Sequence, residues 1–486
     1  MKKYIIIFDD TNPKSEVIQD VIGDKGFADI VIKRKKVELY YSDIVKKAFP
    51  NCEWHTVKSV FEFNDMQKAV DKFFSDDVHV MHCFSNFIIS DKEKAIHTFG
   101  KLEFIDNDYK LISEQKICGL MFASAENYIH YLKQVCKSGN SLAPAKEIKE
   151  QITIDGIVDI GVVSNFIQCI TGNFDSRFFN SLSGTEYTLV KSSTDKKKIK
   201  SEYTYYHLLP NDMKYWFVMP FNYRETETSA SYTMERLHMT DLAIKWVHGS
   251  IDEAEFEEVM EKYCYFFEQR HKKEIDKYSY IKISNDLYVN KVIERIEKLK
   301  TLPEFQPISK MMEAGCPYKS IDNVVKKYLE LKEKLEANTK FRYISVIGHG
   351  DPCFANTLYN KATKTLKFID PKGTLTEEGL WTDPYYDIAK LSHSVCGRYD
   401  FFNNALFDIK VNSNFEYELN IDFDNSKHME IFRRKIEEHG FDYRIVRLYE
   451  ASLFISMLPL HIDYPHKVFG FILNAINILK EIENDL

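Results

Sequence analysis

Two short segments, 349–358 and 368–373, constrain this chain more than any other part of its sequence. They read HGDPCFANTL and FIDPKG. Three polar residues in them are Asp351, Asn356 five positions later (356 − 351), and Asp370 a further 14 positions on (370 − 356). A short apolar strand ends at Asp370, so the pattern predicts a loop, a strand and a second loop inside a largely helical region. The fold has to bring these two loops together.

These residue types and this spacing suit phosphoryl transfer. A carboxylate at Asp351 would orient an acceptor hydroxyl and take its proton late in a loose transition state. Asn356 offers a carbonyl oxygen to Mg²⁺, and Asp370 offers a charged oxygen that reaches the β- and γ-phosphates through the ion. We place His349 in the same catalytic set, where it suits orienting the loop backbone better than acting as a base. His-Gly-Asp alone is an ordinary turn sequence, and only its pairing with Asn356 and Asp370 favours a functional interpretation.

Composition narrows the class of protein. A chain of 486 residues exceeds one ordinary core, so we expect two or three domains. The net charge of −8 argues against general nucleic-acid binding, and the run Lys196–Lys200 fits a solvated helix start. Nine cysteines without a CxxC pair fit reduced thiols. The apolar run Tyr4–Phe8 is too short for a signal peptide, and no apolar stretch approaches the ~20 residues of a membrane span, so we expect a cytoplasmic protein without one.

Three regions are predicted along the chain. Residues 1–145 alternate short apolar runs with amphipathic stretches, which indicates an α/β domain with a mostly parallel sheet. The turn-rich residues 137–145 are the expected linker. Residues 241–486 are expected to be mostly helical. The strands expected in the first region are Tyr4–Phe8, Ala28–Ile32, Val78–Phe84 and Ile117–Phe122, and the helices expected there are Asp65–Phe74 and Ala125–Val135. Near the end of the chain, helices are expected at Tyr449–Leu458 and Val468–Ile482.

Residues 150–240 carry strand patterns around one helix. The predicted elements, in order, are strands Phe166–Thr171, Arg177–Leu182 and Glu186–Lys191, helix Lys198–Leu209, and strands Tyr215–Pro220 and Ser231–Leu237. Kinases hold the α- and β-phosphates with a strand lysine that a helical glutamate supports, and Lys191 with Glu202 fits this arrangement. Loop 171–177 has one glycine and no GxGxxG, so it is either a phosphate cover or a plain turn. The backbone at Glu235 and Leu237 is a candidate adenine-binding hinge, with an edge strand as the alternative.

The two opening segments, together with DPYYDIAKL at Asp383–Leu391, resemble the aminoglycoside phosphotransferase and choline kinase group of kinase-like folds. The resemblance implies an α+β, two-lobe, protein-kinase-like fold over about 150–486, with a nucleotide lobe at 150–240 and a catalytic lobe at 241–486. It implies that Asp351 is the catalytic residue and that Asn356 and Asp370 are metal ligands. It also implies that Asp387 supports the catalytic loop; an ordinary charge at a helix N-terminus is the alternative.

The metal segment departs from the protein-kinase form. Asp370 is followed by Pro-Lys-Gly rather than Phe-Gly, so the aromatic switch of many protein kinases is missing, which favours a small-molecule kinase. Lys372 is either a substrate or phosphate contact or a solvated loop residue. Sequences with this variant resemble those associated with bacterial capsule or surface-polysaccharide biosynthesis. For the acceptor site we favour Arg398, which could clamp an anionic group. The other candidates are His393, Tyr399, Asp400, His461 and Asp463.

The first region carries less specific motifs. Asp9 and Asp10 are adjacent, whereas haloacid dehalogenase phosphatases need acids two positions apart. They could bind a metal-nucleotide, as in sugar nucleotidyltransferases, but the glycine-rich loop of those enzymes is missing. His79, His82 and Cys83 suggest a metal cluster by type, but alternation along a strand separates them and favours packing. A degenerate nucleotidyltransferase-like domain used for docking, substrate positioning or oligomer contacts is the simplest interpretation.

The leading hypothesis is a kinase that uses ATP, or another nucleoside triphosphate, and Mg²⁺ to phosphorylate a hydroxyl of a small molecule. A sugar or polysaccharide precursor is the expected acceptor, and no nucleic acid is expected as a partner. The alternatives are a catalytically silent kinase-like module and a bifunctional nucleotidyltransferase-kinase.

Overall fold

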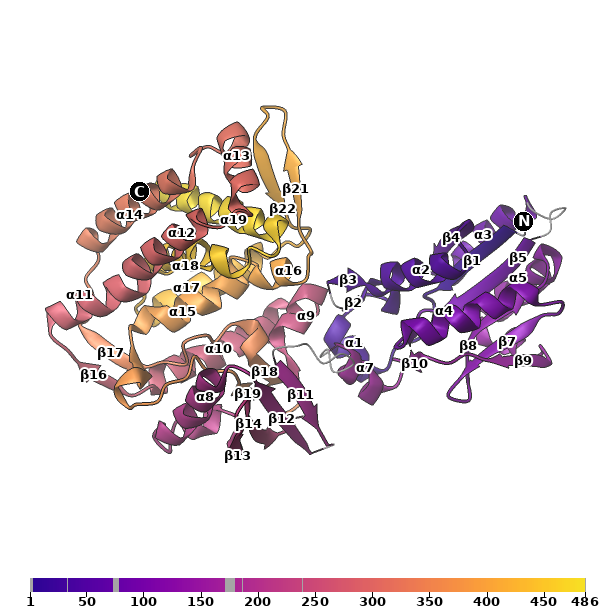
Figure 1. Ribbon diagram of the computed structural model, residues 1–486, viewed down its shortest axis with the longest axis horizontal. Coiled ribbons are helices and arrows are strands. Elements are labelled where there is room, and N and C mark those ends of the chain that lie inside the picture. Colours follow the sequence, from indigo (N-terminus) through magenta and orange to yellow (C-terminus); the bar gives the residue numbers. More distant parts are fainter. Residues whose placement is uncertain are drawn as a thin grey trace. The chain divides into compact units, whose positions relative to one another are not determined.

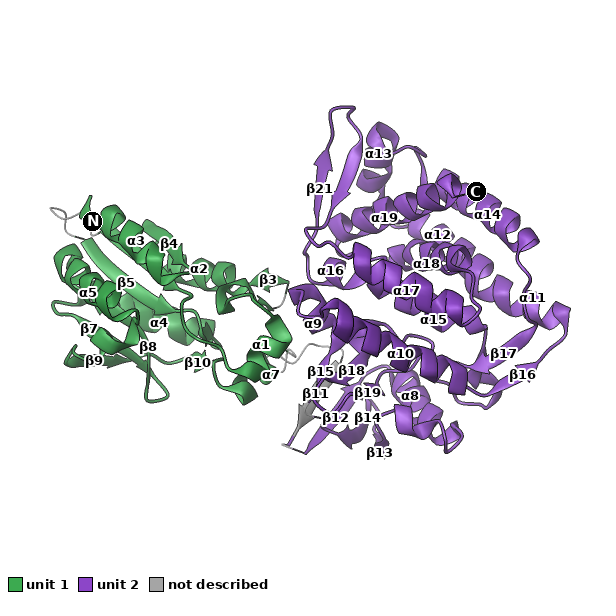
Figure 2. Ribbon diagram, turned by 180° about the vertical axis from the view of Figure 1, so that it is seen from behind, with its two compact units in different colours: residues 1–175 green, residues 176–486 purple. Residues whose placement is uncertain are grey.

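The computed structural model describes residues 3–32, 34–72, 78–170, 180–185, 187–237 and 239–485. The chain divides into two compact units, unit 1 at Met1–Asp175 and unit 2 at Ser176–Leu486 (Figure 2). Among the described helices, none combines the length and apolar character needed to cross a bilayer.

Unit 1 is built on a six-stranded sheet with the strand order β4-β1-β5-β8-β7-β9 (Figure 1). Strand β1 pairs in parallel with β4 and β5, whereas β8 runs antiparallel to β5 and β7. The sheet is therefore mixed rather than mostly parallel. Positive φ angles of 48° at Glu114 and 66° at Gln115 form the tight turn that joins β7 to β8 as a hairpin. The strands are β1 (Lys3–Asp9), β4 (Cys52–Val57), β5 (Val78–Phe84), β7 (Tyr109–Ser113), β8 (Lys116–Phe122) and β9 (Glu150–Thr153).

Alternation along β1 explains how this sheet is covered. Ile5 and Ile7 enter one core cluster with residues of α3 and α5, whereas the Phe8 ring contacts Tyr41 of α2. Side chains of a strand point alternately to its two faces, so both faces of β1 are buried. The helices of unit 1 are α1 (Glu16–Ile22), α2 (Val37–Ala48), α3 (Phe63–Asp71), α4 (Lys92–Lys101), α5 (Ala125–Ser138), α6 (Leu142–Ala145) and α7 (Val163–Ile170).

The boundary between the units differs from the predicted one. The expected linker at 137–145 lies within unit 1, because β9 returns to pair with β7 and β10 (Ile157–Asp159) pairs with β6 (Phe87–Ile89). The strand predicted at Phe166–Thr171 is wrong, since 163–170 form helix α7. Val163, Phe166, Ile167 and Ile170 follow helical spacing, which outweighs their β propensity.

Unit 2 begins with a small antiparallel sheet in the order β11-β12-β14-β13, which packs against helix α8 (Lys196–Leu208). Ile199 of α8 packs with Tyr232 and Met234 of β14. The strand predicted at Tyr215–Pro220 is wrong: 214–216 form a single 3₁₀ turn, and Trp216 lies in the core of the helical part of the unit. The strands are β11 (Asn180–Gly184), β12 (Thr188–Ser193), β13 (Pro220–Glu225) and β14 (Ala230–Glu235).

The rest of unit 2 is mainly helical, as the sequence predicts. The expected helices Tyr449–Leu458 and Val468–Ile482 fall in α18 and α19, which pack together in the core. The helices are α9 (Leu242–His248), α10 (Glu253–Gln269), α11 (Lys277–Asn285), α12 (Lys291–Lys300), α13 (Phe305–Gly315), α14 (Ile321–Asn338), α15 (Pro384–Val395), α16 (Tyr399–Asn403), α17 (Ser426–Glu438), α18 (Tyr443–Met457) and α19 (Pro465–Asn484).

Short strands position the two opening segments within this helical part. Strand β17 (Ile344–Ile347) leads into the first loop, and the hairpin of β18 (Thr357–Asn360) and β19 (Thr365–Phe368) carries the chain to Asp370. Strand β18 also pairs with β15 (Thr240–Asp241), and β17 pairs with β16 (Lys272–Glu274) and β20 (Trp381–Thr382). Strands β21 (Asp408–Val411) and β22 (Tyr417–Asn420) form a separate hairpin.

Candidate active site

Asp387 holds the loop that contains Asp351. Its carboxylate accepts hydrogen bonds from the backbone N–H groups of His349 (2.9 Å) and Gly350 (2.8 Å). The guanidinium of Arg270 donates to the same carboxylate at 3.1 Å, and both side chains are buried. Burial lowers the pKa of Arg270, although the charge of Asp387 opposes this. A buried carboxylate with three donors fixes the course of the loop.

Helix α15 presents two more residues to the same loop. Asp387, Lys390 and Ser394 lie at positions i, i+3 and i+7, which is one face of a helix. Lys390 forms an ion pair with Asp351 at 3.1 Å, and the Ser394 hydroxyl accepts the N–H of Phe354 at 3.1 Å. Neither Lys390 nor Ser394 was predicted as a site residue, although their spacing from Asp387 along the helix was a usable signal.

His349 is held as a neutral ring that orients the backbone. Its Nδ1 accepts the N–H of Asp351 at 3.1 Å, so Nε2 carries the hydrogen and donates to the carbonyl of Ile369 at 3.0 Å. Burial lowers the pKa of His349, although the charges of Asp387 and Asp351 oppose this. Both ring nitrogens bond to backbone groups, which is the arrangement expected of a ring that orients the loop.

Asn356 and Asp370 supply the oxygen atoms that suit Mg²⁺. The Asn356 amide nitrogen donates to the Asp351 carbonyl at 2.9 Å, which fixes the amide and makes its oxygen a candidate ligand. Asp370 has a φ of 55°, an uncommon conformation that non-glycine residues adopt mainly in turns and at functional sites. Mg²⁺ is usually held by one or two protein oxygens together with substrate phosphates, so this pair fits the ion.

Lys191 links the strand sheet to Asp370. Its ammonium lies 2.8 Å from Glu202 of α8 and 2.7 Å from Asp370. Burial lowers the pKa of Lys191, but the charges of Asp370 and Glu202 outweigh burial and the pKa is raised. Tyr232 donates to Glu202 at 3.1 Å. The side chains of Lys191 and Glu202 are 4% and 2% exposed, whereas that of Asp370 is 39% exposed, so a buried ion pair supports an accessible carboxylate.

The loop after Asp370 packs against both parts of unit 2. The Lys372 N–H donates to the His349 carbonyl at 3.0 Å, and the Thr374 N–H donates to Ser201 of α8 at 3.1 Å. Gly350, at a φ of 85°, faces Lys372 so closely that an added Cβ would lie 2.5 Å from the Lys372 Cβ. The backbone of Lys372 therefore ties the two loops together, while its side chain is exposed.

The remaining predicted residues are described by their place in the fold. Glu235 ends β14, and Leu237 lies in the connection from β14 to β15, as a hinge would. Arg398 is the N-cap residue of α16 with a φ of 51°, and burial together with the charge of Arg447 lowers its pKa; its role toward an acceptor stays a prediction. Loop 171–177 lies outside the described residues. The acceptor candidates His393 and Asp400 are buried, and the His393 ring stacks on Tyr399.

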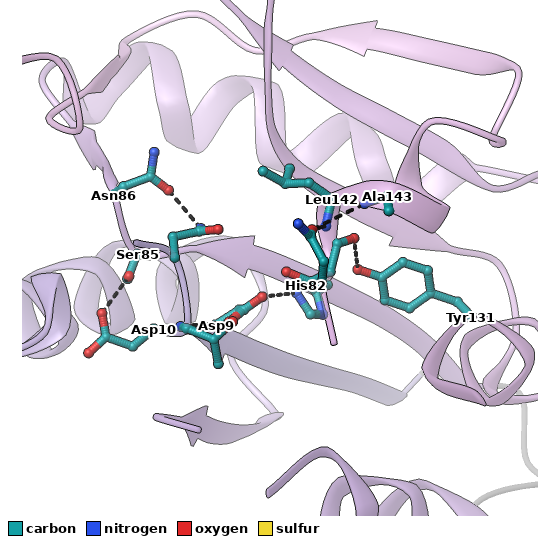
Figure 3. A network of polar contacts seen from close by, with 12 residues as sticks. Asp9, Asp10, His82, Ser85, Asn86, Tyr131, Leu142 and Ala143 are labelled. Atoms are coloured by element: carbon teal, nitrogen blue, oxygen red, sulfur yellow. Dashed lines mark hydrogen bonds and ion pairs between the residues drawn. The ribbon is translucent and has the colours of Figure 1, made fainter. Parts of the chain in front are cut away.

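The acids at the end of β1 in unit 1 are held by protein donors (Figure 3). Asp9 bonds to His82 at 3.0 Å and to the Thr11 hydroxyl at 2.7 Å. Asp10 accepts the Ser85 hydroxyl at 2.6 Å and the Ala28 N–H at 3.1 Å. These contacts account for two buried carboxylates in a folded core without any ligand.

No protein-family model matches this chain, and no curated protein matches it. Similar solved structures include a choline/ethanolamine kinase family protein from Mesorhizobium loti (12% identity, 63% of this chain and 85% of that chain, TM-score 0.35). Another is a thermostable mutant of an aminoglycoside phosphotransferase with AMP-PNP and hygromycin B (12% identity, 65% of this chain and 98% of that chain, TM-score 0.36). A third is a Streptomyces rimosus aminoglycoside phosphotransferase with ADP and streptomycin (14% identity, 61% of this chain and 98% of that chain, TM-score 0.32). At such low TM-scores these similarities support no functional conclusion.

Proposed function

We propose that this chain is an ATP- and Mg²⁺-dependent phosphotransferase that phosphorylates a hydroxyl group of a small molecule. The observation that carries the proposal is that helix α15 and strand β12 together position two accessible acids, Asp351 and Asp370. Helix α15 holds the Asp351 loop through Asp387, and Lys191 joins the sheet to Asp370. Asp351 and Asp370 are 40% and 39% exposed, whereas the groups that position them are buried. Positioning and electrostatics of this kind account for most of the catalysis of phosphoryl transfer.

Each residue has a proposed role in this reaction. Asp351 orients the acceptor hydroxyl and receives its proton as the new P–O bond forms and the bond to the departing ADP breaks. Lys191, supported by Glu202, binds the α- and β-phosphates. Asn356 and Asp370 would hold Mg²⁺, which neutralises charge on the phosphates when bound. The backbone at Glu235 and Leu237 would bind the adenine.

We infer a sugar or polysaccharide precursor as the acceptor, as in bacterial capsule or surface-polysaccharide biosynthesis, from the resemblance of the segment around Asp370. Unit 1 would serve in docking, substrate positioning or oligomer contacts, since its buried acids Asp9 and Asp10 are bonded to protein donors.

ADP release across a panel of sugars, aminoglycosides and amino alcohols tests the proposal. Acceptor-dependent release that is lost in Asp351→Asn but retained in Asp408→Asn, an exposed acid on β21, supports the kinase. No release with any acceptor, together with nucleotide binding that is absent or independent of Mg²⁺, would favour a silent module. Pyrophosphate release from a sugar phosphate and a nucleoside triphosphate, surviving Asp351→Asn, would assign a transferase activity to unit 1.

A further inference from the structure

Three lysines meet at one buried tyrosine beside Asp351. Tyr386 of α15 is 2% exposed, and its hydroxyl accepts a hydrogen bond from Lys291 at 3.0 Å. The ammonium groups of Lys291 and Lys372 lie 5.4 Å and 5.9 Å from the centre of its ring. Lys390 follows Tyr386 by one helical turn and contacts Asp351. We call Lys291, Lys372 and Lys390 the lysine cluster.

The lysine cluster carries more positive charge than its surroundings balance. Lys390 is paired with Asp351, but within the described part of the chain neither Lys291 nor Lys372 forms an ion pair with a carboxylate. Burial raises the pKa of Tyr386, yet the charges of Lys390 and Lys291, with a smaller effect of Lys372, outweigh burial and lower the pKa. Cations that converge without counter-charges form a site for an anion.

Local backbone structure places Lys291 at this point. A π-helical turn at Asp286–Asn290 interrupts the helix between α11 and α12, and Lys291 is the first residue after it. Such wide turns are costly and occur often at functional sites. Lys372 comes from a different part of the chain, the loop that follows Asp370, and its N–H donates to the His349 carbonyl.

The lysine cluster lies on the acceptor side of the site. It is joined to Asp351, the proposed partner of the acceptor hydroxyl, through Lys390. The nucleotide lysine, Lys191, is paired instead with Glu202 and Asp370. An anion bound by Lys291 and Lys372 would therefore be placed next to the hydroxyl that Asp351 orients.

We propose that the acceptor carries a phosphate or carboxylate group close to the hydroxyl that is phosphorylated, and that Lys291 and Lys372 bind this group. The inference rests on the proposed kinase function and defines the chemical class of its acceptor. Lysine ammonium groups bind phosphate and carboxylate oxygens through charge-assisted hydrogen bonds. A neutral polyol or a cationic amino sugar would leave the cluster unbalanced.

Binding of inorganic phosphate to the full chain tests the inference without turnover. Titration calorimetry is carried out with saturating AMP-PNP and Mg²⁺, so that the nucleotide fills the γ-phosphate position. The wild type is expected to bind phosphate at one site per chain. The double variant Lys291→Gln/Lys372→Gln should bind phosphate at least about tenfold more weakly, which is the loss expected when charge-assisted hydrogen bonds are removed. Lys282→Gln/Lys298→Gln, which removes two exposed charges from α11 and α12, is the matched control and should bind normally.

Absence of phosphate binding by the wild type, or equal binding by the double variant, would overturn the inference. Matched acceptors provide the second measurement: glucose, glucose 6-phosphate and gluconate, and glycerol with glycerol 3-phosphate. The anionic member of each set should have the higher kcat/KM, and the better of glucose 6-phosphate and gluconate distinguishes phosphate from carboxylate. Preference for the neutral members would overturn the inference while the kinase proposal stands. Absence of ADP release with every acceptor contradicts the kinase proposal, and the phosphate titration then decides only whether Lys291 and Lys372 form an anion site.

Discussion

Substitution of Asp387 by asparagine should destabilise unit 2 strongly, although it changes only one atom of the side chain. The carboxylate accepts from His349, Gly350 and Arg270, and both it and the Arg270 side chain are buried. An amide keeps one acceptor oxygen and turns a donor toward the remaining N–H groups. It also leaves the buried Arg270 charge without its ion-pair partner. Breaking a buried pair in this way costs about 3–5 kcal/mol of unfolding free energy.

Urea unfolding of the full chain, followed by tryptophan fluorescence, measures this loss. Trp246 is fully buried in the core of unit 2 and reports its unfolding. Asp408→Asn is the exposed control and should change stability by less than about 0.5 kcal/mol. The double variant Arg270→Met/Asp387→Asn should be less destabilised than the sum of the two single variants, because it removes the unpaired charge.

A loss below about 1 kcal/mol in Asp387→Asn, or strict additivity with Arg270→Met, would refute this account of the loop. The kinetic effect follows from the same contacts. Because Asp387 positions the backbone beside Asp351 rather than the nucleotide, kcat should fall while the KM for ATP changes little.

Three further outcomes are expected. Lys191→Met removes the cation held between Glu202 and Asp370, so equilibrium binding of ATP should weaken roughly 10-fold or more; unchanged affinity would argue against the nucleotide site. Burial raises the pKa of Asp400 to about 7, so its carboxyl is more protonated in the folded than in the unfolded chain and stability falls as pH rises from about 4 to about 7. Asp400→Asn should therefore raise the unfolding free energy by roughly 2–4 kcal/mol at pH 8 and hardly change it at pH 4; equal effects at both values would contradict the assignment. For His349, ¹⁵N NMR at pH 6 should show a neutral ring protonated on Nε2, and an imidazolium signal would contradict the bonds to Asp351 and Ile369.

The sequence was most informative where chemistry depends on spacing along the chain. Asp351, Asn356 and Asp370 belong to two loops joined by one hairpin, so their proximity follows from local structure. The pairing of Lys191 with Glu202 could also be predicted, because a strand followed directly by a helix places them close together.

Contacts that depend on tertiary packing could not be predicted in the same way. Arg270 is 117 positions from Asp387, and Lys291 is 95 positions from Tyr386, so no local pattern joins them. Likewise, the aromatic run at Trp216 reads as a strand but anchors the helical core.

The most direct test of the central claim is acceptor-dependent ADP release by the wild type and by Asp351→Asn, each with saturating ATP and Mg²⁺. Loss of a carboxylate that receives the hydroxyl proton should lower kcat by at least about 100-fold and leave the KM for ATP nearly unchanged. Equal rates of acceptor-dependent release in the two proteins would show that Asp351 is not the catalytic residue and would contradict the proposed function.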